Sequence, residues 1–234
     1  FQVRDNERAA TSLAYLDSTG DANYTFYKEE PLAATDYSMP EFTDRDYFLF
    51  GSYYSICPGL RPQVKDILHA AHRAGTVIYY DINFRRSHIH QKQELLPVIQ
   101  ENCRLSSIVR GSADDFDILF GTRDPEEIYR KHISPFCPIF ICTAGAGHIF
   151  ICTPKGTYDF IVPQIPANEI VSTVGAGDSF NAGFLCAMHR QAICKADLAD
   201  MSHNQWKLLV EHGIKYSSQV CRSQDNYIKP LSDK

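Results

Sequence analysis

Long apolar runs are absent from this sequence, and none approaches the ~20 residues that a membrane-spanning helix needs. Positive charge is not in excess either, because 23 Lys and Arg stand against 28 Asp and Glu, a net charge of −5. Internal repeats and low-complexity tracts are also missing. A membrane or nucleic-acid partner is therefore not expected, whereas a local basic site for a phosphorylated ligand is compatible with this charge.

C-x-x-C pairs are missing among the eight cysteines, and several cysteines, such as Cys142 and Cys152, lie inside apolar runs. We interpret them as buried reduced thiols that act as small hydrophobes, with disulfides or a zinc site as the alternatives. Reduced thiols predict a cytoplasmic protein. No signal peptide is visible at Phe1, and the chain begins without Met, so we expect its natural N-terminus to lie upstream.

The composition is that of a globular protein, with 44% hydrophobic and 22% charged residues. Its 234 residues suit one domain, or one domain with a small appendage. Two β-prone runs around a Gly/Asn/Asp turn predict a hairpin over 12–28, and a polar stretch with two prolines over 31–45 indicates a connection. We therefore divide the chain into a small β unit over 1–45 and an α/β body over 46–234.

Strands and helices alternate along the body, which predicts a mainly parallel sheet covered by helices. The expected strands are 47–50, 76–80, 107–110, 139–143 and 148–153, and the expected helices are 61–74, 93–103, 114–120, 125–132, 178–190 and 205–221. In such sheets ligands bind beyond the carboxyl ends of the strands. The loops after Tyr80, Thr143 and Thr173 should therefore share one face.

The most informative segment is Gly175-Ala176-Gly177-Asp178, directly before a helical pattern. Its small residues let an anion approach the main-chain N–H groups of Gly175, Ala176 and Gly177, and the helix dipole favours negative charge there. Asp178 could accept the proton of a substrate hydroxyl while the hydroxyl oxygen attacks phosphorus. The alternative is a tight turn with Asp178 as a helix cap.

This segment resembles the signature of the ribokinase/PfkB carbohydrate kinase family, matching also at Thr173 and Phe180 but departing at Ser172, where the family commonly has Asp. The resemblance implies a ribokinase-like, mainly parallel sheet flanked by helices, with a small β lid formed by the hairpin. It also implies ATP and Mg²⁺ as cofactors and a sugar as the phosphoryl acceptor. Family members begin with a sugar-gripping portion that nothing here matches, so the resemblance implies that this portion is missing.

Three further segments resemble the family in its order. In 81–86, Asn83 and Arg85 are expected to orient sugar and phosphate, since Arg presents a planar fork to such oxygens. The turn with Thr143, Gly145 and Gly147 resembles the nucleotide loop, although its second glycine comes one residue early. The alternatives are a turn with solvated arginines and an ordinary turn between strands.

Ser112-Ala113-Asp114-Asp115 resembles the Asn-x-x-Glu magnesium motif with both key residues replaced. Asp115 could act on Mg²⁺ through a water, because this ion prefers hard oxygen ligands and keeps its waters. The alternative is an acid that only stabilises a helix start.

The resulting prediction is an ATP-dependent sugar kinase, most like fructokinase, with a homodimer through the lid. Within the family, a 2-keto-3-deoxygluconate kinase is the nearest alternative, since Arg85 could meet a sugar acid. A non-catalytic sugar- or nucleotide-binding protein on the same fold is the alternative from another class. A dehydrogenase is disfavoured because no strand-linked G-x-G-x-x-G is present.

Overall fold

The computed structural model describes residues 11–16, 22–27 and 37–228. Two sheets are present in this part of the chain, a hairpin of two strands and a six-stranded sheet of order β3-β4-β5-β6-β7-β8. The strands are β1 (Thr11–Leu16), β2 (Ala22–Tyr27), β3 (Tyr47–Gly51), β4 (Val77–Asp81), β5 (Ile108–Ser112), β6 (Phe140–Ala144), β7 (His148–Thr153) and β8 (Gly156–Ile161). The helices are α1 (Arg61–Arg73), α2 (Lys92–Leu105), α3 (Ala113–Phe120), α4 (Pro125–Ile128), α5 (Ala176–Arg190) and α6 (His203–Cys221).

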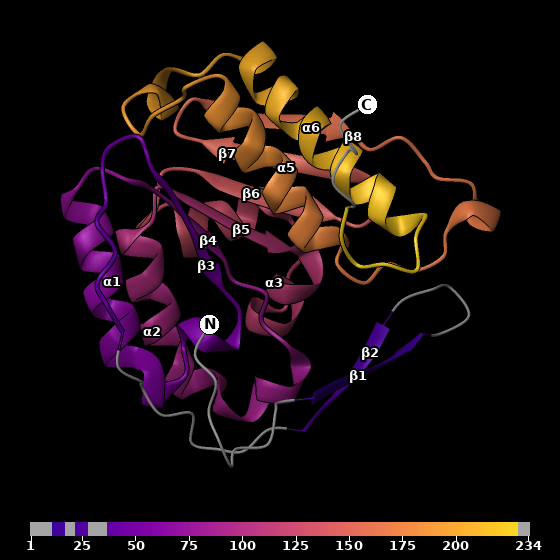
Figure 1. The fold of residues 1–234 in the computed structure, drawn as a ribbon, viewed down its shortest axis with the longest axis horizontal. Coiled ribbons are helices and arrows are strands. Elements are labelled where there is room, and N and C mark those ends of the chain that lie inside the picture. Colours follow the sequence, from indigo (N-terminus) through magenta and orange to yellow (C-terminus); the bar gives the residue numbers. More distant parts are fainter. Residues whose placement is uncertain (1–10, 17–21, 28–36, 229–234) are drawn as a thin grey trace.

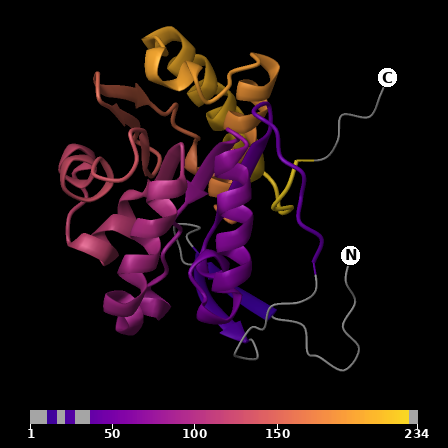
Figure 2. The same ribbon diagram turned by 90° about the vertical axis from the view of Figure 1, so that its left-hand side faces the viewer.

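Strands β3 to β6 run parallel, and β7 and β8 continue the sheet in antiparallel fashion. Helices α5 and α6 cover one face of the sheet, while α1, α2 and α3 lie on the other, and the β1–β2 hairpin projects from the body (Figures 1 and 2). The predicted mainly parallel sheet flanked by helices is confirmed. The predicted hairpin forms over its described residues, while 17–21 and 28 lie outside them, as do 1–10 and 31–36.

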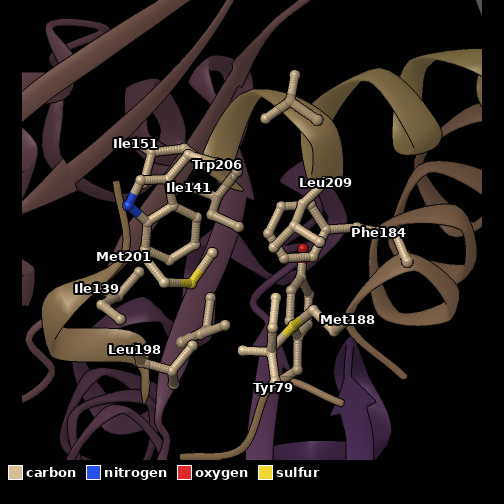
Figure 3. Close-up of a cluster of buried hydrophobic side chains, with 14 of the residues drawn as sticks. Tyr79, Ile139, Ile141, Ile151, Phe184, Met188, Leu198, Met201, Trp206 and Leu209 are labelled. Carbon is tan, nitrogen blue, oxygen red and sulfur yellow. The ribbon is translucent and has the colours of Figure 1, made fainter. Parts of the chain in front are cut away.

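The core is built from two rows of side chains that alternate along each parallel strand, as the pleat requires. Val77 and Tyr79 of β4 point toward α5 and α6 and belong to the same buried cluster as Phe184 and Trp206. Figure 3 shows Tyr79 beside Phe184 of α5 and Trp206 of α6 in this cluster. Ile78 packs with α1, and other side chains of the sheet, such as Val109, pack with α2 and α3. Both faces of β4 are therefore buried, which explains its continuous apolar and aromatic sequence.

The sequence prediction missed β8, an edge strand in which only Phe160 is buried. Its alternation of Tyr158 and Phe160 with polar residues was the available signal. Helix α2 forms although Pro97 lies inside it, because its Leu95, Ile99 and Cys103 are buried against the sheet. The segment after α4 continues as a π-helical turn over Tyr129–Ile133.

All eight cysteines are free, six of them buried and Cys186 and Cys194 half-buried, in line with the interpretation as reduced thiols. Burial raises the pKa of Cys152 to about 11 and that of Cys142 to about 12, so both stay protonated at neutral pH. None of the helices in the described ranges combines the length and the apolar character of a membrane-spanning segment.

Candidate active site

A cavity of about 560 Å³ opens at the carboxyl ends of the parallel strands, next to the start of α5. The loops that follow β3, β4 and β5 contribute to it, together with the segment before α5, the end of the chain after α6 and two residues of the hairpin, Thr11 and Tyr27. This is the edge at which parallel α/β sheets bind their ligands. Of the predicted site residues, the cavity lining includes Asn83, Arg85, Asp115, Gly175, Gly177 and Asp178.

Four predicted residues lie outside the cavity lining within the described part of the chain: Ala176, Thr143, Gly145 and Gly147. The amide of Ala176 already donates a hydrogen bond to the carbonyl oxygen of Thr173, at 3.1 Å. Gly145 adopts φ of 59° in the turn between β6 and β7, which is a conformation that glycine permits.

Helix α5 begins without a side-chain cap. Its N-cap residue is Gly175, with φ of 81°, and its first intrahelical bond runs from the amide of Ser179 to the carbonyl of Gly175. A side chain at Gly175 would meet the carbonyl oxygen of Asn226 at 2.7 Å from its Cβ. Both the backbone angle and the approach of Asn226 therefore require glycine at this position. Because glycine offers no capping side chain, the helix start stays open to the cavity.

A buried charged network lies beneath this helix start. Arg110 of β5 pairs with Asp81 of β4, Nη1 being 3.1 and 3.0 Å from the two carboxylate oxygens, and Nη2 donates to Oγ1 of Thr143 at 2.9 Å. Asn181 of α5 donates to Asp81 at 2.6 Å and accepts from the Tyr79 hydroxyl at 3.1 Å. The network thus ties β4, β5 and β6 to the first turns of α5.

Arg110 places positive charge directly under the glycine segment. A Cβ on Gly177 would lie 3.4 Å from both Nη1 and Nη2 of Arg110. The Nε of Arg110 is buried and has no hydrogen-bond partner in the described part of the chain. Burial opposes the charge of Arg110, but Asp81, Tyr79 and Asp115 together outweigh that cost and keep the pKa of Arg110 above the usual value. The guanidinium therefore remains charged beside the amides at which an anion would bind.

Asp178 lies in the first turn of α5 and lines the cavity. Desolvation of its carboxyl by the cavity walls, followed by the charge of Asp81, raises its pKa, while Arg110 and Arg85 act in the opposite direction. The residue as a whole is exposed, so solvent screens these effects and we expect a modest shift. A carboxylate whose pKa lies above the usual value is well suited to take a proton.

Asp115 has a structural task as well as a place in the cavity lining. Its carboxylate accepts bonds from the amide and hydroxyl of Ser112, at 2.7 and 2.8 Å, and so completes a capping box at the start of α3. Burial raises its pKa. Across the described ranges, no group of three or more His, Cys, Asp or Glu is arranged to hold a metal ion.

A profile of the pfkB family carbohydrate kinases matches residues 1–223. The chain belongs to this family. It is 29% identical over 192 residues to the aminoimidazole riboside kinase of Salmonella typhimurium, with 78% of this chain and 57% of that protein covered. It is 25% identical over 191 residues to the 2-dehydro-3-deoxygluconokinase of Escherichia coli K12, with 76% and 62% covered. The chain thus spans about three fifths of these pfkB relatives.

A solved structure with the same fold is a double mutant of the fructokinase of Vibrio cholerae, with fructose, ADP and potassium bound. Its TM-score is 0.76 at 22% identity, with 95% of this chain and 70% of that chain covered. The fold expected from the family signature is thereby confirmed.

Sequence reasoning assigned no role to Asp81, Arg110, Asn181, Ser52 or Asn226, although Asp81 lies in the 81–86 segment that resembles the family. One sequence signal could have indicated Arg110, namely a single charge at the end of the apolar run Ile108-Val109. A charge in a buried strand needs a partner, so this pattern predicts an ion pair. The closeness of Asn226 to Gly175 depends on the tertiary fold and has no signal in the local sequence.

Proposed function

We propose that this pfkB chain carries the phosphoryl-transfer site of an ATP-dependent sugar kinase. The observation that supports this most is the uncapped glycine start of α5, which opens on the cavity with Asp178 in its first turn and Arg110 beneath Gly177. Amide dipoles and a buried guanidinium stabilise negative charge far better in such a site than in water. This arrangement suits the charge that spreads over a transferring phosphoryl group.

In the proposed reaction, the oxygen of a sugar hydroxyl bonds to the γ-phosphorus of ATP while the bond from phosphorus to ADP breaks. Asp178 accepts the proton of that hydroxyl. Gly175, Gly177 and Arg110 would stabilise the oxygens of the group in transfer, while the amide of Ala176 stays bonded to Thr173. The proton leaves later from Asp178 to solvent. Arg85, exposed at the cavity, would orient phosphate oxygens. We keep Thr143, Gly145 and Gly147 as the proposed nucleotide loop, with Thr143 linked to Arg110.

Mg²⁺ would accompany the nucleotide and neutralise phosphate charge. Asp115 and Asp178 offer oxygens to the cavity, while Asp81 is neutralised by Arg110, so the donor set suits a hydrated ion carried by ATP better than a resident one. Because one oxygen of Asp115 is engaged by Ser112, this side chain would act on Mg²⁺ through a water.

Fructose is the first acceptor to test, and 2-keto-3-deoxygluconate is the second because Arg85 could meet its carboxylate. Residues 1–45 would form the lid and connection, and 46–234 the catalytic body, since Thr11 and Tyr27 reach the cavity lining. Leu13 and Tyr15, 42% and 58% exposed on alternate positions of β1, would join two lids in a homodimer. The free cysteines support a cytoplasmic location.

The deciding experiment is ADP release by the full-length protein with ATP, Mg²⁺ and a panel of sugars and sugar acids. Sugar-dependent release is expected, and the preferred acceptor identifies the substrate. Sugar binding without ADP release would favour the non-catalytic binding protein. Absence of both would overturn the assignment.

A further inference from the structure

Two polar residues line the β3–β4 side of the cavity: Asn83, which is expected from the sequence to orient sugar and phosphate, and Ser52, which has no predicted role. Ser52 follows β3 and Asn83 follows β4, and the Nδ2 of Asn83 donates to Oγ of Ser52 at 2.8 Å. Both residues line the cavity and are half-buried. The pair therefore presents its remaining polar atoms to the space where a ligand would bind.

Both residues hold unusual backbone conformations. Ser52 has φ of 55° and Asn83 has φ of 41°. In the described part of the chain, Ala192 is the only other non-glycine residue with a positive φ. Positive φ is uncommon for Ser, and it persists only where the surroundings enforce it. Here the amide of Ser52 donates to the carbonyl of Asp81 at 3.1 Å.

Close contact between the two strand ends enforces this geometry. A Cβ on Gly51 would lie 2.0 Å from the carbonyl oxygen of Asp81, so the end of β3 can approach β4 only because Gly51 has no side chain. Ser52 and Asn83 are thus held side by side at the ends of β3 and β4, and β4 also carries Asp81, the partner of Arg110 on β5.

The polar groups of Ser52 and Asn83 that are not used in their mutual hydrogen bond suit the binding of an alcohol. Oγ of Ser52 accepts from Asn83, so its hydrogen is available to donate, while Oδ1 of Asn83 remains an acceptor. One donor and one acceptor at adjacent positions suit a hydroxyl group, which both accepts and donates. Tyr53, stacked on His88 with ring centroids 4.1 Å apart, also lines the cavity here and offers an apolar surface beside the pair.

The order of the strands assigns this end to the acceptor. Arg110 and Gly177 mark the position of the phosphoryl group at β5, and the proposed nucleotide loop follows β6. In-line transfer puts the attacking and leaving oxygens on opposite sides of phosphorus, so the acceptor belongs on the β3–β4 side.

We propose that Ser52 and Asn83 together bind a hydroxyl of the sugar acceptor, one other than the hydroxyl that is phosphorylated. This inference rests on the proposed sugar-kinase function, and it names a specificity contact within that site. Ser52 is a binding residue here, and its strained backbone fixes the hydroxyl in place.

The test compares the full-length wild type with Ser52→Ala and Ser52→Gly, using Ala192→Gly as a matched control. Ala192 has φ of 50° and is exposed in the turn after α5, outside the cavity lining. Both glycine variants relieve positive φ, so each is expected to raise Tm by about 2–4 °C. Only the Ser52 variants should raise the KM for the sugar, by about 3- to 10-fold, with the KM for ATP unchanged.

Calorimetric binding of the same sugar separates this inference from the proposed function. Weaker sugar binding in both Ser52 variants, without turnover in the wild type, would support the inference and reject the kinase. Normal turnover with an unchanged sugar KM and Kd in Ser52→Ala would reject the inference and keep the kinase. Wild-type protein that binds none of the sugars tested would overturn both.

Discussion

Helices α5 and α6 pack against each other on one face of the sheet (Figure 1). Their first turns are nevertheless built in opposite ways. Helix α6 begins with a complete capping box, in which Ser202 and Gln205 satisfy each other's amides. Helix α5 begins at Gly175 with no side-chain cap. A cap stabilises a helix by covering its first amides, so an uncapped start beside a cavity gives up that stability and leaves amides for the proposed phosphoryl site.

The largest effect on stability should come from the network beneath the uncapped start. Arg110→Met leaves Asp81 as a buried, unpaired carboxylate, which costs roughly 3–5 kcal/mol in free energy of unfolding. Urea unfolding measures this cost. The double variant Asp81→Leu/Arg110→Met should recover much of it, because no buried charge is then left unpaired, and a double variant as unstable as the single one would contradict the pairing.

Gly175→Ala should have the next largest effect. Its Cβ would meet the Asn226 carbonyl and its φ is positive, so we expect a loss of more than ~1 kcal/mol together with reduced turnover. Thermal unfolding and ADP release on the same preparation measure both. Gly121→Ala at the end of α3 is the control, since φ there is 71° but no atom lies within 4 Å. It should lose stability without losing turnover.

Ser202→Ala removes the cap of α6 and should cost about 1 kcal/mol. Since α6 begins outside the cavity lining, the KM values and kcat of the folded protein should not change. This variant separates the contribution of a helix start to stability from its contribution to catalysis. A loss of turnover at temperatures where the variant is folded would contradict it.

The pH dependence should show the smallest effect. As the proposed base, Asp178 would act when ionised, and its pKa is raised, so the acid limb of kcat/KM should have its midpoint above the usual Asp value of about 3.9. Arg85→Gln removes a charge that lowers this pKa and should move the limb further up. An acid limb that stays unmoved would contradict the assignment of Asp178 as the base.

The same shift has a consequence for stability. A carboxyl whose pKa is higher in the folded state binds more protons folded than unfolded, so its contribution to the unfolding free energy falls as pH rises between the usual and the raised pKa. Asp178→Asn should remove this dependence in that window, and unfolding at a series of pH values measures it.

Local sequence signals predicted most of the fold because they report local physics. The apolar run of β4 and the glycines before α5 appear in the structure close to where the patterns placed them. Edge strand β8 was missed because only one of its six residues is buried. The site was predicted less completely: Asp178, Asn83 and Arg85 follow strand or turn signals, whereas the pairing of Arg110 with Asp81 depends on which strands lie side by side.

In the proposed mechanism, the open start of α5 holds a phosphoryl group while Asp178 takes the proton of the sugar. The decisive measurement is the kcat of Asp178→Asn in the full-length protein, together with the Kd for ATP, beside Asp66→Asn on the exposed surface of α1 as a control. We predict a loss of roughly 10²- to 10⁴-fold in kcat with the Kd for ATP nearly unchanged, and no loss in the control. Turnover of Asp178→Asn close to that of the wild type would contradict the account.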